Sequence, residues 1–310
     1  MKRLTRLLLP ALGLCLAALL PCSANADSEP FSFSVLAPPR TASDEDRALQ
    51  ASIEETDADN LAFVVTQGIK PAGEPCTDKV YLRQKSLLDS ARNGLIVSLA
   101  ASDWARCQAE SAKSSAFGRL ARLRDLLFAD DFSLGASRLP VTRQSLIAKF
   151  RNFPENARWE VGGIMFATIN LPSNNNNYVV DAGRNSEFED RLVANRDWLN
   201  RVFTFAQREK AAGIVLFSDS NPLAPARPGQ RDGFAETRRL LVGLAGKFPG
   251  KILVVHGPAP GATRSGVITW RGNVGELGVA PGWTKVKVDT RQSRLFAVEA
   301  RAAREPEGQR

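Results

Sequence analysis

Histidine is almost absent from this 310-residue chain, in which His256 is the only one. Any mechanism that needs a histidine base therefore has a single candidate. The Gly-x-Ser-x-Gly turn of serine hydrolases and the His-Glu-x-x-His pattern of zinc peptidases are both missing. Glycine-rich loops of the kinds that bind nucleotide phosphates are missing too. These absences exclude the common sequence signatures of hydrolases and nucleotide-binding enzymes.

Long apolar segments are also missing, apart from one near the first residue. The run from Leu7 to Leu20 follows three basic residues and is shorter than the roughly 20 residues of a membrane-spanning helix. Ala-Asn-Ala at 24–26 has the small-x-small pattern of a processing site. We therefore expect 1–26 to be a signal peptide cleaved near Ala26. The mature protein should then be periplasmic or secreted, with no stable insertion in a membrane.

Cysteine is scarce, with four residues in the chain. Cys15 and Cys22 lie in the expected leader, and the residues before them are not the small ones of a lipoprotein signal, so lipidation is the less favoured alternative. Cys76 and Cys107 are then the only pair left, and an oxidising compartment should join them in a disulfide. A reactive or metal-binding role for these thiols is the weaker alternative.

Basic residues outnumber acidic ones, giving a formal net charge of +8. The excess is spread thinly, and lysines and arginines recur among acidic residues in segments such as Arg119–Asp125. Such a mixture is typical of a solvated helix face. We expect no nucleic-acid partner.

No proline- or serine-rich linker and no internal repeat divides the chain. We therefore expect one domain over 27–302 and a disordered tail over 303–310. Short apolar strands alternate with amphipathic helices and give way to a strand-rich end. The helices are expected at Ser43–Glu55, Thr77–Arg92, Ser115–Phe128, Ser186–Lys210 and Gly233–Lys247. The strands are expected at Phe31–Leu36, Leu61–Thr66, Leu95–Leu99, Arg158–Val161, Ile164–Ile169, Ile214–Phe217, Ile252–His256, Val267–Trp270, Thr284–Val288 and Leu295–Val298. This order predicts a layered α/β fold with central mixed sheets flanked by helices.

Five segments together resemble the secreted bacterial branch of the calcineurin-like metallophosphoesterase superfamily. They are FSFSVLAPPR, LAFVVTQGIKPAGEPCTD, VSLAASDWARC, NARWEVGGIMFATINLPSNNNN and ILVVHGPAP. The resemblance spans nearly the whole expected mature chain. It implies a metallophosphoesterase-like fold whose strand-end loops hold two metal ions through Asp, Asn and His side chains, so that the metals activate water and bind phosphate oxygens.

The metal-binding motifs of that family are altered in this sequence. Ala37-Pro38-Pro39 stands where the family has Gly-Asp. Gly68 replaces the aspartate that bridges the two metals, and the third motif reads Ala-Ala-Ser-Asp at 100–103 in place of Gly-Asp-Asn-Glu. The last motif has Pro260 where the family ends in histidine. The resemblance therefore implies a metallophosphoesterase scaffold with a lost dinuclear metal site, and no cofactor is expected.

A few polar residues remain as candidates for function. His256 and Asp103 are the weak catalytic candidates, although His256 is more simply a near-core histidine and Asp103 a turn residue. Asn174 and Asn175 can line a cleft or simply form a turn. Asp219 and Ser102 are further cleft candidates.

Two functions stay open at this point. The favoured one is a non-catalytic pseudoenzyme that binds a small ligand or an envelope protein through the old cleft. The alternative is a metal-dependent phosphoesterase of altered ligation, which uses one divalent transition metal, Mn, Fe or Zn, held by Asp103, Asp219, His256 and the asparagines.

Overall fold

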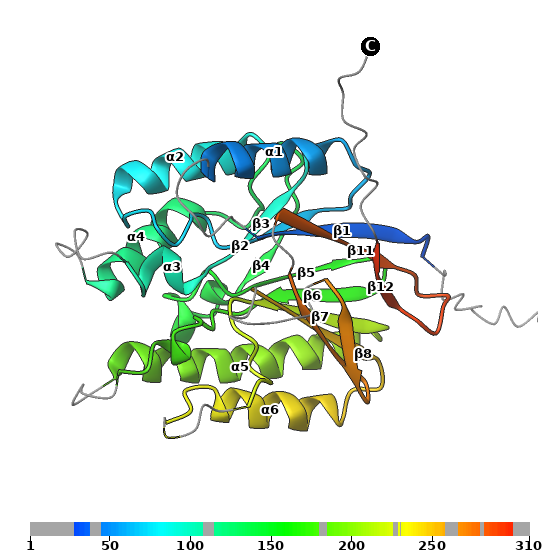
Figure 1. Ribbon diagram of the computed structural model, residues 1–310. Coiled ribbons are helices and arrows are strands. Elements are labelled where there is room, and N and C mark those ends of the chain that lie inside the picture. The colour runs from blue at the N-terminus through cyan, green and yellow to red at the C-terminus, as the bar shows by residue number, and fades with distance from the viewer. Residues whose placement is uncertain are drawn as a thin grey trace, which may run out of the picture.

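Two β-sheets pack face to face in the computed structural model, and helices cover the outer face of each sheet (Figure 1). The structure describes residues 28–37, 45–107, 115–179, 185–225, 229, 231–257, 266–279 and 282–299. The expected leader, the expected tail and the first two residues of the helix expected at Ser43–Glu55 lie outside these residues. The fold is thus mixed α/β with two mixed sheets flanked by helices, as the alternating pattern predicts.

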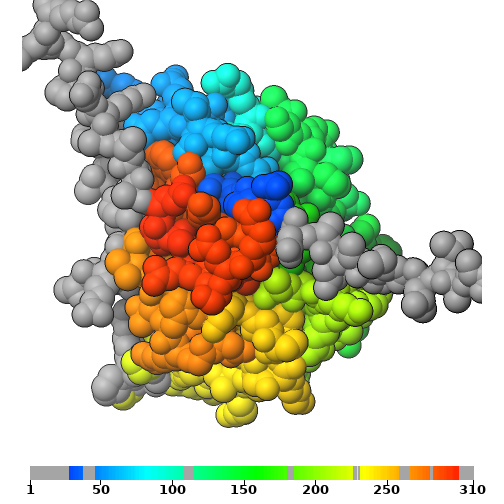
Figure 2. Space-filling view, turned by 90° about the vertical axis from the view of Figure 1, so that its right-hand side faces the viewer, coloured from blue at the N-terminus to red at the C-terminus, as the bar shows by residue number. Residues whose placement is uncertain are grey.

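The first sheet has the strand order β12-β11-β1-β2-β3. Its strands are β1 (Phe31–Ala37), β2 (Val64–Gln67), β3 (Leu95–Ser98), β11 (Gly282–Val288) and β12 (Phe296–Glu299). The first three run parallel, whereas β11 is antiparallel to β1 and pairs with it along its whole length. Strands from the two ends of the chain therefore lie side by side, and Figure 2 shows the blue first strand against the red C-terminal strands.

The second sheet has the strand order β4-β5-β6-β7-β8-β10-β9. Its strands are β4 (Thr142–Arg143), β5 (Ala157–Val161), β6 (Ile164–Thr168), β7 (Gly213–Ser218), β8 (Lys251–His256), β9 (Ile268–Arg271) and β10 (Val274–Gly278). Four of them, β6, β7, β8 and β10, run parallel. The β5–β6 hairpin turns at Gly162-Gly163, where both residues have positive φ, as the sequence predicts.

Aromatic side chains fill the space between the sheets. Phe33 and Phe63 of the first sheet stack with ring centroids 5.3 Å apart, and both contact Phe166 of the second sheet edge-on. Trp159 and Phe217 stack beside them. All five side chains are at least 96% buried. Because successive side chains of a strand point to opposite faces, the alternate residues of these strands face the outer helices.

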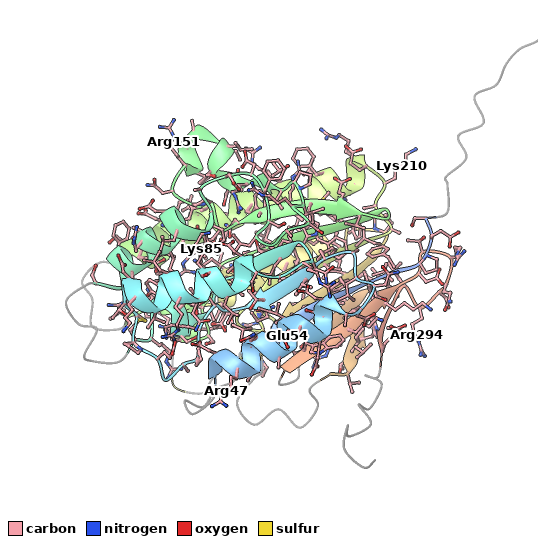
Figure 3. The ribbon with its side chains drawn as sticks, turned by 90° about the horizontal axis from the view of Figure 1, so that it is seen from above. Arg47, Glu54, Lys85, Arg151, Lys210 and Arg294 are labelled. Atoms are coloured by element: carbon pink, nitrogen blue, oxygen red, sulfur yellow. A yellow bond between two sulfur atoms is a disulfide. The ribbon has the colours of Figure 1, made fainter. Side chains whose placement is uncertain are left out.

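The helices complete two outer layers. The first sheet is covered by α1 (Glu45–Asp57), α2 (Asp78–Asp89) and α4 (Ala116–Leu127), and the second by α5 (Ser186–Arg208) and α6 (Ala235–Ala245). Thr77 caps α2 by accepting from the backbone N–H of Val80, and Ser115 caps α4 in the same way. Seen from above, Glu54 on α1 and Lys85 on α2 lie on the outer side of their helices (Figure 3).

The expected helices and strands are confirmed to within a few residues at their ends. Two strands, β4 and β10, were not expected. Short segments also form α3 (Ala101–Trp104), η2 (Gln144–Leu146), η3 (Ala148–Phe150) and η4 (Asn175–Asn177). In the described part of the chain, no helix is both long enough and apolar enough to span a bilayer.

The expected disulfide joins Cys76, in the loop after β2, to Cys107, just after α3. It closes a loop with a sequence separation of 31 residues. Cys76 is buried against the helical layer together with Trp104. The bond therefore ties together the loops that follow two neighbouring strands.

Replacement of both cysteines by alanine should lower the free energy of unfolding by about 3 to 4 kcal/mol, because the unfolded chain gains loop entropy. Urea unfolding of the oxidised protein and of the double variant measures this difference. The wild-type protein in reductant is the control and should unfold like the variant. A loss of less than about 1 kcal/mol would show that the bond adds little to the packed loops.

Candidate functional site

The parallel strands of both sheets end at one edge of the molecule, where the candidate residues gather. Ser102 and Asp103 follow β3, Asn174 and Asn175 follow β6, and Asp219 follows β7, while His256 is the last residue of β8. Ligands of α/β proteins commonly bind at the carboxyl ends of parallel strands. The structure therefore brings the loops of all six candidates to one region.

Asp103 lies in α3 with no exposed surface. One carboxylate oxygen accepts from the backbone N–H of Ile69 (3.1 Å) and the other from that of Ala100 (2.7 Å). Its backbone carbonyl accepts from the hydroxyl of Tyr81 (2.6 Å). Asp103 thus bonds its own turn and also ties that turn to the loop after β2. Ser102, next to it, is half-buried.

Complete burial raises the pKa of Asp103 from 3.8 to about 6. The two backbone N–H groups and the charge of Lys70 oppose this shift, and Asp219 adds to it. Lys70 is itself buried, and its ammonium group donates to the carbonyls of Pro71 and Glu74 (3.0 and 2.7 Å). The carboxyl of Asp103 therefore changes charge in a mildly acidic range.

Gly68 stands where the sequence resemblance would place a metal-bridging aspartate, and its surroundings leave little room for a side chain. Its φ is +93°, which favours glycine. A Cβ atom here would lie 3.0 Å from the Cβ of Ala100 and 3.5 Å from the Oδ1 of Asp103. The loops after β2 and β3 are therefore packed closely against each other at this point.

Asp219 connects the two halves of the chain. Its Oδ2 accepts from the backbone N–H of Ala101, in the first half (2.8 Å), and from that of Ser173, in the loop after β6 (2.7 Å). The nearby Gly257 has no space for a Cβ, which would lie 2.8 Å from the carbonyl oxygen of Asp219. Asp219 thus holds together the loops that follow β3, β6 and β7.

His256 is turned away from the space between the sheets. It follows Val255, which faces the inner core, so its ring lies on the opposite face, where a Cβ on Gly278 would be 3.2 Å from its Cε1. Its Nδ1–H donates to the carbonyl of Gly257 (2.8 Å). Burial lowers the pKa of His256 below 6.5, although this hydrogen bond raises it. The ring is thus neutral near pH 7.

The asparagine run forms a tight loop in which most side-chain amides bond to the protein itself. Asn174 donates to the side chain of Asn177 (3.2 Å), and Asn175 bonds to the backbone of Arg231 and Gly233. A buried network that the sequence did not reveal lies beneath this loop. Its members are Glu155, Asn156, Asn170, Asn176, Glu187, Arg191 and Asn195. The asparagine run was its only visible signal in the sequence.

The described carboxylate oxygens at this edge are mostly bonded to the protein backbone. Both carboxylate oxygens of Asp103 and the Oδ2 of Asp219 accept from four backbone N–H groups. The charge of Asp219 also acts on His256 and raises the pKa of its ring. A bound cation would have to compete with these N–H dipoles for the same oxygens. No group of three or more His, Cys, Asp or Glu side chains that could hold a metal occurs in the residues the structure describes.

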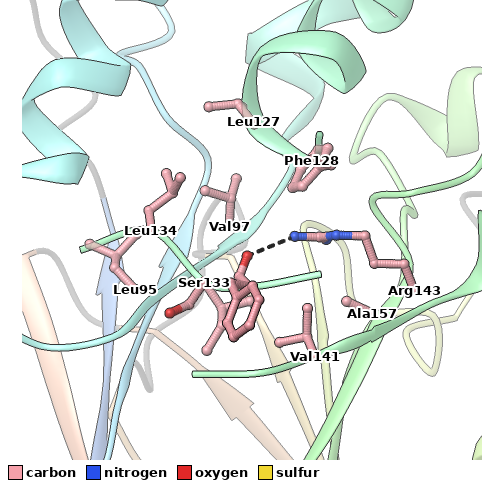
Figure 4. A pocket seen from close by; sticks show the side chains of 11 residues that line it. Leu95, Val97, Leu127, Phe128, Ser133, Leu134, Val141, Arg143 and Ala157 are labelled. Carbon is pink, nitrogen blue, oxygen red and sulfur yellow. Dashed lines mark hydrogen bonds between the residues drawn. The ribbon is translucent and has the colours of Figure 1, made fainter. Parts of the chain in front are cut away.

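A cavity of about 10 Å³ lies elsewhere, between β3, the end of α4 and β5 (Figure 4). That volume holds about one water molecule. The guanidinium group of Arg143 borders it and donates to the backbone carbonyl of Phe132 (3.0 Å). None of the sequence-predicted candidates lines this cavity.

Comparisons with known proteins add little. No protein-family model and no curated protein matches the chain. Among solved structures, GAP50, the anchor in the inner membrane complex of Plasmodium, aligns with a TM-score of 0.49 and 10% sequence identity. The alignment covers 87% of this chain and 88% of that one. A likeness of this size carries no argument about function.

The carboxyl of Asp103 should titrate near pH 6, which carboxyl ¹³C NMR can measure. Between its ordinary pKa and about 6, the folded state binds more protons than the unfolded state, so stability falls as pH rises through this range. The loss amounts to about 3 kcal/mol at most. Asp103→Asn should remove this contribution to the pH dependence of stability. The contribution of other groups with shifted pKa values, such as His256, should remain. A titration midpoint below about 4.5 would contradict the assignment.

Asp219→Ala should cost about 2 to 4 kcal/mol of stability, because two backbone N–H groups lose a charged acceptor. Hydrogen exchange at the amides of Ala101 and Ser173 should accelerate more than tenfold. Asp197→Ala is the matched control, since Asp197 pairs with Arg201 on the surface of α5. Equal exchange at both amides in the two variants would show that Asp219 does not hold these loops.

Proposed function

We propose that this protein is an exported, non-catalytic binding protein on a metallophosphoesterase-like scaffold. In this proposal the loops at the strand ends contact a small ligand or an envelope protein. The main observation behind the proposal is that Asp103 and Asp219 each accept hydrogen bonds from two backbone N–H groups. Acidic side chains that could have served as metal ligands instead fix the positions of loops.

Three further features support the proposal. The helix-covered pair of mixed sheets is compatible with the scaffold that the sequence resemblance implies. The disulfide between Cys76 and Cys107 is compatible with folding in an oxidising compartment. Gly68, packed against Ala100, leaves little room for the bridging aspartate of the family.

Metal content and turnover test the proposal directly. Protein purified from the periplasm without chelator should hold less than about a tenth of an equivalent of manganese, iron or zinc. It should not hydrolyse a chromogenic phosphate monoester or diester above background, with or without added metal.

The contrary outcome is equally specific. Metal-stimulated turnover that a chelator abolishes and that His256→Ala removes would establish the phosphoesterase alternative and overturn the proposal. Arg239→Gln, on the exposed side of α6, is the control for nonspecific loss of activity. Turnover that survives His256→Ala would be assigned to a contaminating phosphatase.

A further inference from the structure

Two loops at the end of the second sheet are joined into one unit. The side chain of Asn175 donates to the carbonyl of Arg231 (2.9 Å) and accepts from the N–H of Gly233 (2.9 Å). Asn176 donates to the carbonyl of Gly233 (2.9 Å). A Cβ on Gly233 would lie 2.2 Å from the carbonyl oxygen of Asn175, so the two backbones touch. The loop after β6 and the segment before α6 are therefore joined by both hydrogen bonds and direct backbone contact.

The loop after β6 has three consecutive left-handed residues, whereas asparagine normally adopts this conformation singly. Asn175, Asn176 and Asn177 all have φ between 54° and 58°, in the left-handed region. Arg191, fully buried in α5, donates to both the side-chain and the backbone oxygen of Asn176 and pairs with Glu187. A strained loop persists only where its surroundings impose it, and such loops concentrate at functional sites.

This unit presents an aromatic ring and a guanidinium group at the surface. Arg231 lies over the ring of Tyr178, 4.7 Å from its centroid, and donates to its hydroxyl (3.0 Å). The ring of Tyr178 also packs edge-on against that of Phe188, with the centroids 5.3 Å apart. Both side chains are thus held in place before any ligand binds, which reduces the entropy cost of binding.

The charge of Arg231 is balanced differently from that of nearby arginines. Arg191 pairs with Glu187, and Arg238 pairs with Asp232. Arg231 is exposed, and within the described ranges no carboxylate lies within ion-pairing distance of it. Stacking on the ring of Tyr178 and one hydrogen bond to its hydroxyl hold the guanidinium group, which has further N–H donors to offer a ligand.

We propose that Tyr178 and Arg231 form an anion-recognition point that binds a carboxylate or phosphate group of the ligand. A guanidinium group matches both kinds of anion because its planar fork can donate two parallel hydrogen bonds. This inference rests on the proposed binding function and names the chemistry that the strand-end loops recognise. The source of the anion, a phosphorylated molecule or an acidic one, is distinguished by the test.

The test follows the Nε–H signal of Arg231 by ¹⁵N NMR during two titrations of the full mature protein. One uses sodium phosphate and the other a tetraglutamate peptide, each at constant ionic strength made up with sodium chloride. The signal should shift and saturate with at least one of the two. Arg231→Gln, followed at neighbouring backbone amides, should weaken binding at least about tenfold, and Tyr178→Leu should weaken it by about half that factor.

Arg239→Gln is the matched control, because it removes the same charge from an exposed site on α6. It should change the affinity less than about twofold. Saturation by phosphate alone identifies a phosphoryl ligand, and saturation by the peptide alone identifies an acidic one. The inference is overturned if neither titration saturates, or if Arg239→Gln weakens binding as much as Arg231→Gln.

Failure here can be separated from failure of the proposed function. The metal content and the turnover of the protein do not depend on Arg231. If the protein holds no metal, shows no turnover and gives no NMR shift in either titration, the anion site is rejected and the non-catalytic proposal stands. Metal-dependent turnover overturns the proposed function whatever the titration shows.

Discussion

The packing of aromatic rings between the two sheets determines where every candidate residue lies. Phe33 and Phe63 from one sheet interlock with Phe166 and Phe217 from the other at centroid distances of 4.8 to 5.9 Å. Interlocked rings do not slide past one another without opening voids. The sheets are therefore fixed in relative position, and the loops at their carboxyl ends come within hydrogen-bonding distance of each other.

Two carboxylates use this proximity to join loops that the chain itself does not connect. Asp103 joins the loops after β2 and β3, and Asp219 joins those after β3, β6 and β7. In a metallophosphoesterase, metal ions would join such loops through their ligands. In this protein, hydrogen bonds from backbone N–H groups to Asp103 and Asp219 cross-link the loops without a cation.

The sequence predicted most of the fold because its elements have clear periodicity. Strands such as β7 and β8 are short, continuous apolar runs, and α5 has an apolar face along its whole length. The strand β10, with two glycines and a glutamate, has no such pattern and forms because it pairs with β8. The disulfide was predictable from the number of cysteines, because only Cys76 and Cys107 lie outside the expected leader.

The site was less predictable, because its contacts depend on residues far apart in sequence. The turn role of Asp103 was anticipated, but its bond to Ile69, 34 residues away, was not. In the sequence, the asparagine run is compatible with either a cleft rim or a turn. Its conformation in the structure depends on hydrogen bonds from Arg191, in the following helix, to Asn176. Sequence periodicity locates elements, whereas partners of single polar side chains depend on the packed structure.

Arg191 and the asparagine loop stabilise each other, and this dependence makes the loop unlike an ordinary surface turn. Three left-handed residues cost on the order of 1 kcal/mol each, so the loop alone would adopt other conformations. A buried guanidinium group without acceptors would be costlier still. Asn176 supplies acceptors to the buried guanidinium group, and Arg191 in return holds the loop in its left-handed conformation. Tyr178 and the backbone of Arg231 are bonded to this fixed loop, so their positions at the surface are set by the buried network beneath them.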